Sequence, residues 1–252
     1  MIGRLRRAGL LWPTVLSIAG LAILIGLGRW QLARKAEKEA LIAKIEARRL
    51  GQPAQLAEFI AARPGADADY QKLSARGSFV ADKERFYYAP QPKLGPGYDV
   101  YQPLTYAPGK VVWVNRGFIP ERVFDQPEQW RAGPGEVNVV GNARLPAKPG
   151  LFTPDNDVGA NVWYWRDLAG MQASAFGGDD GMEAAPFFLV AGPEETASRP
   201  AKTPVDDTQW PRPGVSKVAV ENRHLEYAVT WFGLALTLVG VYAVFAWSRL
   251  RG

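Results

Sequence analysis

Two long apolar stretches, one near each end of the chain, dominate the hydrophobic pattern. They cover residues 8–28 and 227–248, and neither contains a charged residue. A helix needs roughly 20 mostly apolar residues to cross the hydrocarbon core of a bilayer. Trp12 and Trp30 bracket the first stretch, as is typical of side chains in the headgroup layer. The pattern therefore predicts two transmembrane helices, which we assign to residues 9–29 and 223–248.

The segment that follows the first stretch differs from it in amino-acid composition. Residues 31–50 are rich in Ala, Leu, Glu, Lys and Arg, and they contain no Gly or Pro. These residue types favour helix, so the first helix is expected to continue as a juxtamembrane helix over residues 30–52 until Gly51 and Pro53 stop it. Its charged face is typical of a solvated stalk, with a docking arm as the alternative interpretation.

The middle of the chain, residues 53–222, reads as one β-rich (α+β) domain. Segments rich in β-branched and aromatic residues alternate with Gly-Pro turn signals, which predicts a small antiparallel barrel or sandwich. Asp167 is a good N-cap, so one short helix is expected from there to about Phe176. Residues 205–217 read as an irregular approach to the second apolar stretch. The predicted strands are Tyr70–Val80, Arg85–Ala89, Tyr98–Tyr106, Val111–Ile119, Glu136–Leu145, Asn161–Arg166 and Pro186–Val190.

The distribution of charge predicts the orientation of the two helices. The net charge is +5, and basic residues gather beside the apolar stretches, which favours a membrane surface over nucleic acid. Arginines in the short tails 1–8 and 249–252 place both termini in the cytoplasm by the positive-inside rule and the main domain on the periplasmic side. The first apolar stretch exceeds a signal-peptide core and lacks an A-x-A-like site, so an uncleaved anchor is expected. The N-terminal arm is too short for a mitochondrial transit peptide, which favours a bacterial plasma (inner) membrane.

Composition narrows the chemistry. The chain has no cysteine, which excludes disulfides, thiol catalysis and thiolate metal sites, and it has a single histidine, His224. Asp155, Asn156 and Asp157 lack the spacing of a calcium loop, so a turn is the expected role. A membrane-anchored enzyme would need a polar catalytic cluster that this pattern does not show, so we predict no catalytic residues.

The entrance to the second apolar stretch carries the most informative cluster. His224, Tyr227, Ala228 and Trp231 share one face of a helix. A histidine at the bilayer edge beside Arg223 suits the iron of an amphipathic haem, with the arginine paired to propionates. The alternative is a histidine that only forms a local hydrogen bond.

Four short strings, in this order, resemble the surfeit locus protein 1 family of cytochrome c oxidase assembly factors. They are GRWQ at residues 28–31, PGYDV followed by QPL at 96–104, VWVNRGFIP at 112–120 and HLEYAVTWF at 224–232. The resemblance implies a protein that helps haem A reach subunit I of the oxidase. Haem A synthase and other assembly factors are further candidate partners, beside membrane lipid. No string in residues 168–213 carries the resemblance.

Residue by residue, the resemblance implies that His224 ligates the haem iron. The residues predicted to bind haem A are His224, Arg223, Tyr227, Trp231, Trp30, Gln31, Gly28 and Arg116. Gly28 is expected to permit close approach of the two helices. Trp30 and Gln31 are expected to lie at the depth of His224, so that the helix ends form one site at the outer membrane face. Arg116 is either a propionate partner or, preferably, a member of a buried ion pair.

Three hypotheses follow. The leading one is a haem A chaperone in oxidase assembly. The second is a haem-free scaffold that holds an oxidase assembly intermediate through the helix pair. The third, an anchored extracytoplasmic enzyme, ranks last because the sequence shows no catalytic motif.

Overall fold

The computed structural model describes residues 9–62, 67–177, 181–192, 209–213 and 222–251. Packing divides the chain into two units. Residues 1–44 and 220–252 form a helical unit, and residues 45–219 form a β unit. Each unit is described by itself below.

Two long helices build the helical unit, and the first of them continues past residue 44 into the β unit. They are α2 (Leu11–Leu50, 40 residues) and α5 (His224–Arg251, 28 residues). The predicted continuation of the first helix is confirmed, because α2 runs unbroken to the residue before Gly51. Pro13 lies in its first turn, where a missing N–H costs no helical hydrogen bond. Both helices are long and apolar enough to cross a membrane.

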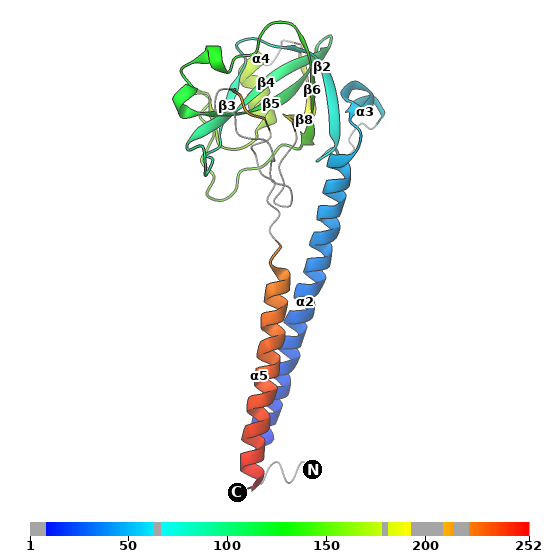
Figure 1. Cartoon of the computed structure of the whole chain (residues 1–252), viewed down its shortest axis with the longest axis vertical. Helices are drawn as coiled ribbons and strands as arrows, with labels where there is room; N and C mark the ends of the chain where they lie inside the picture. The colour runs from blue at the N-terminus through cyan, green and yellow to red at the C-terminus, as the bar shows by residue number, and fades with distance from the viewer. Residues whose placement is uncertain (1–8, 63–66, 178–180, 193–208, 214–221, 252) are drawn as a thin grey trace. The chain divides into compact units, whose positions relative to one another are not determined.

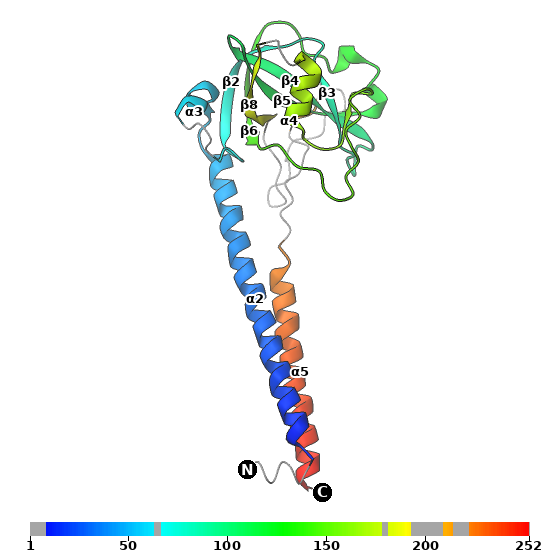
Figure 2. The same ribbon diagram turned by 180° about the vertical axis from the view of Figure 1, so that it is seen from behind.

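The two helices pack side by side and antiparallel (Figures 1 and 2). Their contacts pair rising residue numbers in α2 with falling numbers in α5: Thr14 with Tyr242, Gly28 with Phe232, and Gln31 with His224. Small residues of α5 fill the seam, since Ala228 and Ala235 are 1% and 5% exposed. Small residues at a helix interface let two backbones approach closely.

The β unit contains eight strands and several short helical elements. Their bounds are β1 Ala54–Gln55, β2 Lys72–Phe79, β3 Arg85–Tyr88, β4 Gly97–Ala107, β5 Lys110–Pro120, β6 Glu136–Arg144, β7 Val162–Trp163 and β8 Glu183–Ala191. The short elements are α3 Leu56–Ala62, the 3₁₀ turns η1 Glu121–Val123 and η2 Pro127–Gln129, and α4 Leu168–Phe176.

The sheet closes on itself, which confirms the predicted barrel. The strand order is β1-β2-β6-β8-β5-β4-β3-β7, and an additional pairing of β2 with β4 closes a barrel of five strands, β2, β6, β8, β5 and β4. The expectation of a purely antiparallel sheet was wrong, because β5 pairs with β8 in parallel. A parallel pair needs a long crossover, and the chain between these two strands supplies one that contains β6, β7 and α4.

The predicted strands all appear, although one is much shorter than expected. In the segment 161–166 only Val162 and Trp163 are paired as a strand. The next two backbone N–H groups, of Tyr164 and Trp165, donate instead to the side-chain oxygen of Asn156 at 2.8 and 3.2 Å. The turn predicted at residues 155–157 lies at 158–161 instead, and Asp157 begins it by accepting a hydrogen bond from the N–H of Ala160 at 2.9 Å.

The short helix predicted after Asp167 is confirmed as α4. The Asp167 carboxylate accepts from the backbone N–H of Gly170 at 2.9 Å, which satisfies one of the free donors at the helix start. The sequence reasoning missed α3 and the short strand β1 before it. Most of the predicted irregular segment 205–217 lies outside the described residues, and within 209–213 Arg212 pairs with Phe118 of β5.

Apolar side chains fill the barrel and cover its outer face. The barrel interior includes Leu73, Leu104, Val112, Val114 and Leu189. A second cluster joins Met171 of α4 to Trp113 and Trp163, all fully buried. Several of these residues belong to the strands that contain the strings shared with the family. Many residues in those strings therefore serve to pack the core.

Candidate functional site

The single histidine lies at the first residue of α5, in contact with α2. The Nδ1 atom of His224 lies 2.7 Å from the side-chain oxygen Oε1 of Gln31. An amide oxygen only accepts hydrogen bonds, so Nδ1 carries the hydrogen and donates it. In a neutral ring this leaves the lone pair on Nε2, the form in which imidazole binds metals. Gln31 itself is 9% exposed, so its amide is held inside the helix pair.

Gly28 sets the spacing of the helices beside this pair. A Cβ atom added at Gly28 would lie 2.7 Å from two ring carbons of Phe232. Gly28 and Gln31 are three residues apart and share one face of α2. The contact between Gly28 and Phe232 therefore holds α5 at the distance at which His224 reaches Gln31.

The aromatic residues predicted around His224 differ in how far they are exposed. Tyr227 and Trp30 are 54% and 52% exposed, whereas Trp231 is half-buried. The guanidinium of Arg34 lies over the Trp30 ring at 5.9 Å. Arg223, the residue before α5, is exposed. The first turn of α5 and the middle of α2 thus present a histidine with exposed aromatic surface and a cation close by in sequence.

This donor set fits haem. A neutral imidazole is a common axial ligand, exposed rings suit the apolar macrocycle, and an arginine suits propionates. Among the described residues, no group of three or more His, Asp or Glu side chains is placed to hold a metal ion.

Arg116, the remaining predicted site residue, belongs to the β unit. Its guanidinium donates to the side-chain oxygen of Gln102 at 2.9 Å and to the backbone carbonyl of Trp130 at 2.8 Å. It also lies over the ring of Phe79 at 5.2 Å. Burial lowers the pKa of Arg116 to about 10, and the nearby carboxylate of Glu84 acts in the opposite direction. The two hydrogen-bond acceptors are neutral, so this arginine ties β5 to its neighbours by hydrogen bonds.

We expect Arg116→Leu to destabilise the β unit by about 2–4 kcal/mol, because two partly buried acceptors lose their donor. Denaturant unfolding of the purified protein measures this change. If Arg116 serves only the fold, the variant that remains folded should bind haem as the wild type does. A normal unfolding midpoint with weakened haem binding would instead assign Arg116 to the propionates.

Two family strings meet in a buried polar contact that the sequence reasoning missed. The amide of Asn115 on β5 donates to the carboxylate of Asp99 on β4 at 3.0 Å, and both residues are about 3% exposed. Burial raises the pKa of the adjacent Tyr101, and the Asp99 carboxylate adds to the effect. The presence of a polar residue in each apolar string was the signal, but only strand pairing places the two together.

Gly117 occupies a backbone position that other residues rarely adopt. Its φ angle is +124°, and a Cβ atom there would lie 2.3 Å from the backbone carbonyl of Arg212. The Gly117 N–H donates to the side chain of Asn115 at 2.9 Å. The Arg-Gly pair of the family string therefore combines a hydrogen-bonded arginine with a backbone conformation within β5 that favours glycine.

Gly117→Ala is expected to lower the free energy of unfolding by about 2–5 kcal/mol. The change adds both backbone strain and a clash with the backbone of another segment. Thermal unfolding measures this effect. Gly133→Ala is the matched control, because a Cβ atom there meets nothing within 4 Å. Equal melting temperatures for the two variants would contradict the assignment.

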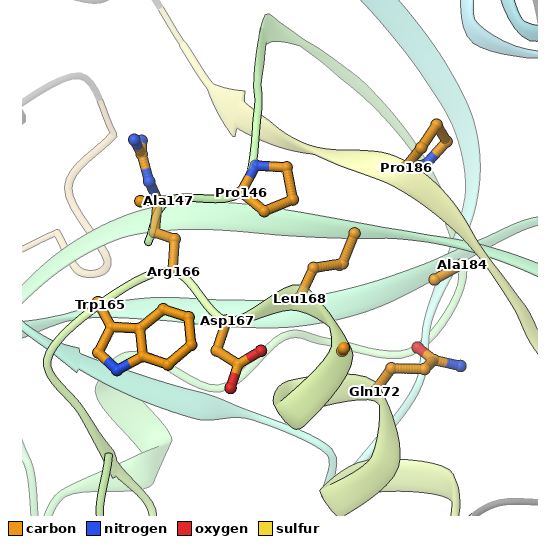
Figure 3. Close-up of a pocket in the computed structure, with 10 residues that line it drawn as sticks. Pro146, Ala147, Trp165, Arg166, Asp167, Leu168, Gln172, Ala184 and Pro186 are labelled. Carbon is orange, nitrogen blue, oxygen red and sulfur yellow. The ribbon is translucent and has the colours of Figure 1, made fainter. Parts of the chain in front are cut away.

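An open cavity of about 450 Å³ lies on the β unit beside the start of α4 (Figure 3). Trp165, Leu168 and Pro186 line it together with the Arg166 side chain. None of the residues predicted to bind haem lines this cavity. The predicted residues other than Arg116 lie at or near the start of α5 and in the middle of α2.

The chain is similar to a set of related proteins over most of its length. The sequence model of the SURF1 family matches residues 18–236. A SURF1-like protein of Monosiga brevicollis is 32% identical over 98% of this chain and 90% of that protein. Surfeit locus protein 1 of Mus musculus is 32% identical over 84% of this chain and 69% of that protein. A SURF1-like protein of Rickettsia conorii is 27% identical over 88% of this chain and 86% of that protein.

Proposed function

Because the chain belongs to the SURF1 family, whose members are cytochrome c oxidase assembly factors, we propose that it binds haem A and aids its delivery to subunit I. The observation that carries the proposal is the contact of His224 with Gln31 across the helix pair. It leaves the metal-binding nitrogen Nε2 without a hydrogen-bond partner among the described residues.

In this proposal haem is the cargo that the protein carries. The protein holds it by supplying an axial ligand to the haem iron. His224 ligates the iron, Tyr227 and Trp30 cover part of the macrocycle, and Arg223 pairs with a propionate. The apolar surface of the helices accommodates the hydrophobic tail of haem A. The β unit holds a polar network of its own around Asp99, Asn115 and Arg116.

Membrane insertion is supported by the exposure of the two helices. In their most apolar windows only 6% of α2 and 11% of α5 is buried within the protein. Large side chains such as Leu16 and Val241 are 68% and 63% exposed. Such surface is costly in water and suits lipid. With the arginines of the two tails, this favours a membrane protein with cytoplasmic termini, and the β unit then lies on the opposite, periplasmic side of the bacterial plasma membrane proposed for it.

The absence of cysteine from the chain makes this orientation testable with single cysteines. A cysteine at Leu151, which is 92% exposed on the β unit, should react with an impermeant maleimide in intact spheroplasts. Gly252→Cys should react only after the membrane is opened. The cysteine-free wild type is the control for background labelling. The reverse pattern would overturn the proposed orientation.

The pyridine haemochrome spectrum of protein purified from cells that make haem A tests the proposal directly. We expect the absorption of haem A at a fixed ratio to protein. A colourless wild-type preparation from such cells would overturn the proposal.

A haem-free scaffold is the second candidate, and the exposed apolar faces of the helix pair favour it. Those faces suit contact with other membrane helices as well as with lipid. The scaffold predicts that oxidase subunits co-purify equally well when His224 is replaced by alanine. Loss of haem together with loss of co-purification would favour the chaperone.

A further inference from the structure

We propose that Gln31 is a positioning residue that sets the tautomer of His224, so that Nε2 is presented to the cargo iron. This inference rests on the proposed haem-binding function and adds a distinct role to a second residue. It begins with the contact of 2.7 Å between Nδ1 and the Gln31 amide oxygen, which joins positions 193 residues apart in sequence.

The contact selects one of two forms of the ring. A neutral imidazole carries its hydrogen on either nitrogen, and the hydrogen bond made by one nitrogen decides which is free for a metal. In water the form of neutral histidine with its hydrogen on Nε2 is the more populated one. In that form the lone pair lies on Nδ1, the nitrogen that faces Gln31, and Nε2 cannot bind a metal. A hydrogen bond from Nδ1 to Gln31 stabilises the form with a free Nε2.

The geometry of the helix pair makes this hydrogen bond a persistent one. Gln31 is 9% exposed, so its amide oxygen would be poorly hydrated if the bond were lost. Gly28, one turn earlier in α2, seats Phe232 of α5 against the α2 backbone. The two helices are therefore kept at the spacing that the bond requires.

The amide group of Gln31, as the partner of His224, also suits a protein that carries haem and then releases it. A ring N–H bonded to a carboxylate makes the other nitrogen a stronger donor to a metal, whereas a neutral amide raises its basicity less. An amide partner thus orients the ligand without binding the iron as firmly as a carboxylate pair would. A protein that must hand its cargo on benefits from this balance.

The tautomer can be measured without haem, because His224 is the only histidine in the chain. Protein labelled with ¹⁵N-histidine in detergent micelles should give one imidazole, whose ¹⁵N shifts at alkaline pH report hydrogen on Nδ1. Gln31→Leu should move the hydrogen to Nε2, and Gln31→Glu should keep it on Nδ1. Thr237→Val is the control, since this hydroxyl donates to the Gly233 carbonyl within α5 at 2.9 Å. A wild-type ring with its hydrogen on Nε2 would overturn the inference, whatever the protein binds.

Haem titration then tests the consequence. Gln31→Leu should weaken haem binding by about 10–100-fold, as is typical when the partner of a metal ligand is lost. Gln31→Glu should bind at least as tightly as the wild type and lower the reduction potential of the bound haem. If His224→Ala abolishes binding while both Gln31 variants bind as the wild type does, the inference fails and the proposed function stands. If the wild type binds no haem, the proposed function fails, and the tautomer measurement alone decides the role of Gln31.

Discussion

His224→Ala should lower the haem content of the purified protein by at least about 100-fold, because the variant removes the side chain proposed to ligate the iron. The change truncates a half-buried side chain at the first turn of α5 and leaves the seam residue Ala228 in place. The helix pair should therefore remain folded. The ratio of haem to protein and the circular dichroism spectrum measure these two outcomes.

Thr230→Val is the matched control for this variant. Its hydroxyl donates to the Glu226 carbonyl within α5 at 2.9 Å and is exposed, so its removal should leave the haem content unchanged. Equal haem content in His224→Ala and the wild type would show that the histidine is not the ligand. Such a result would favour the scaffold, provided that oxidase subunits still co-purify.

Gly28→Leu should separate the two helices where they carry the proposed site. The Cβ atom alone would lie 2.7 Å from the Phe232 ring, and a leucine adds three more carbons. We expect the variant to destabilise helix pairing by at least about 1–3 kcal/mol, which is roughly a 5–150-fold shift in equilibrium. Haem content should fall with it, because His224 then loses its contact with Gln31.

Two further variants separate this steric cause from general damage to α2. Gly26→Leu lies two residues away, where a Cβ atom meets nothing within 4 Å, and it should behave as the wild type. Phe232→Ala in the Gly28→Leu background should restore part of the haem content by making room. Failure of both the control and the rescue would contradict the proposed helix contact.

Much of the fold could be predicted from local patterns. The uncharged apolar stretches predicted both terminal helices, and the run of helix formers ahead of Gly51 predicted the full length of α2. Asp167 marked the start of α4 because a cap acts on backbone groups within one turn. These features depend on residues that are close in sequence, so a single chain reveals them.

Other features depend on partners that are distant in sequence. The parallel pairing of β5 with β8 follows from the crossover of the chain, and no local pattern distinguishes it from antiparallel pairing. The segment 161–166 has strand propensity, yet Asn156 takes two of its backbone donors. For Arg116 the sequence left two roles open, and the structure shows neutral hydrogen-bond partners on Gln102 and Trp130.

By itself the sequence determined the terminal helices, the β-rich middle and the importance of the lone histidine. Its motifs also marked Gly28 and Gln31, and it predicted a close helix approach at Gly28, but it named no contact partner for either residue. Only the tertiary structure decided that Gly28 receives the Phe232 ring and that Gln31 accepts from His224. The reason is geometric: a hydrogen bond across 193 residues depends on the packing of two helices, which no local pattern encodes.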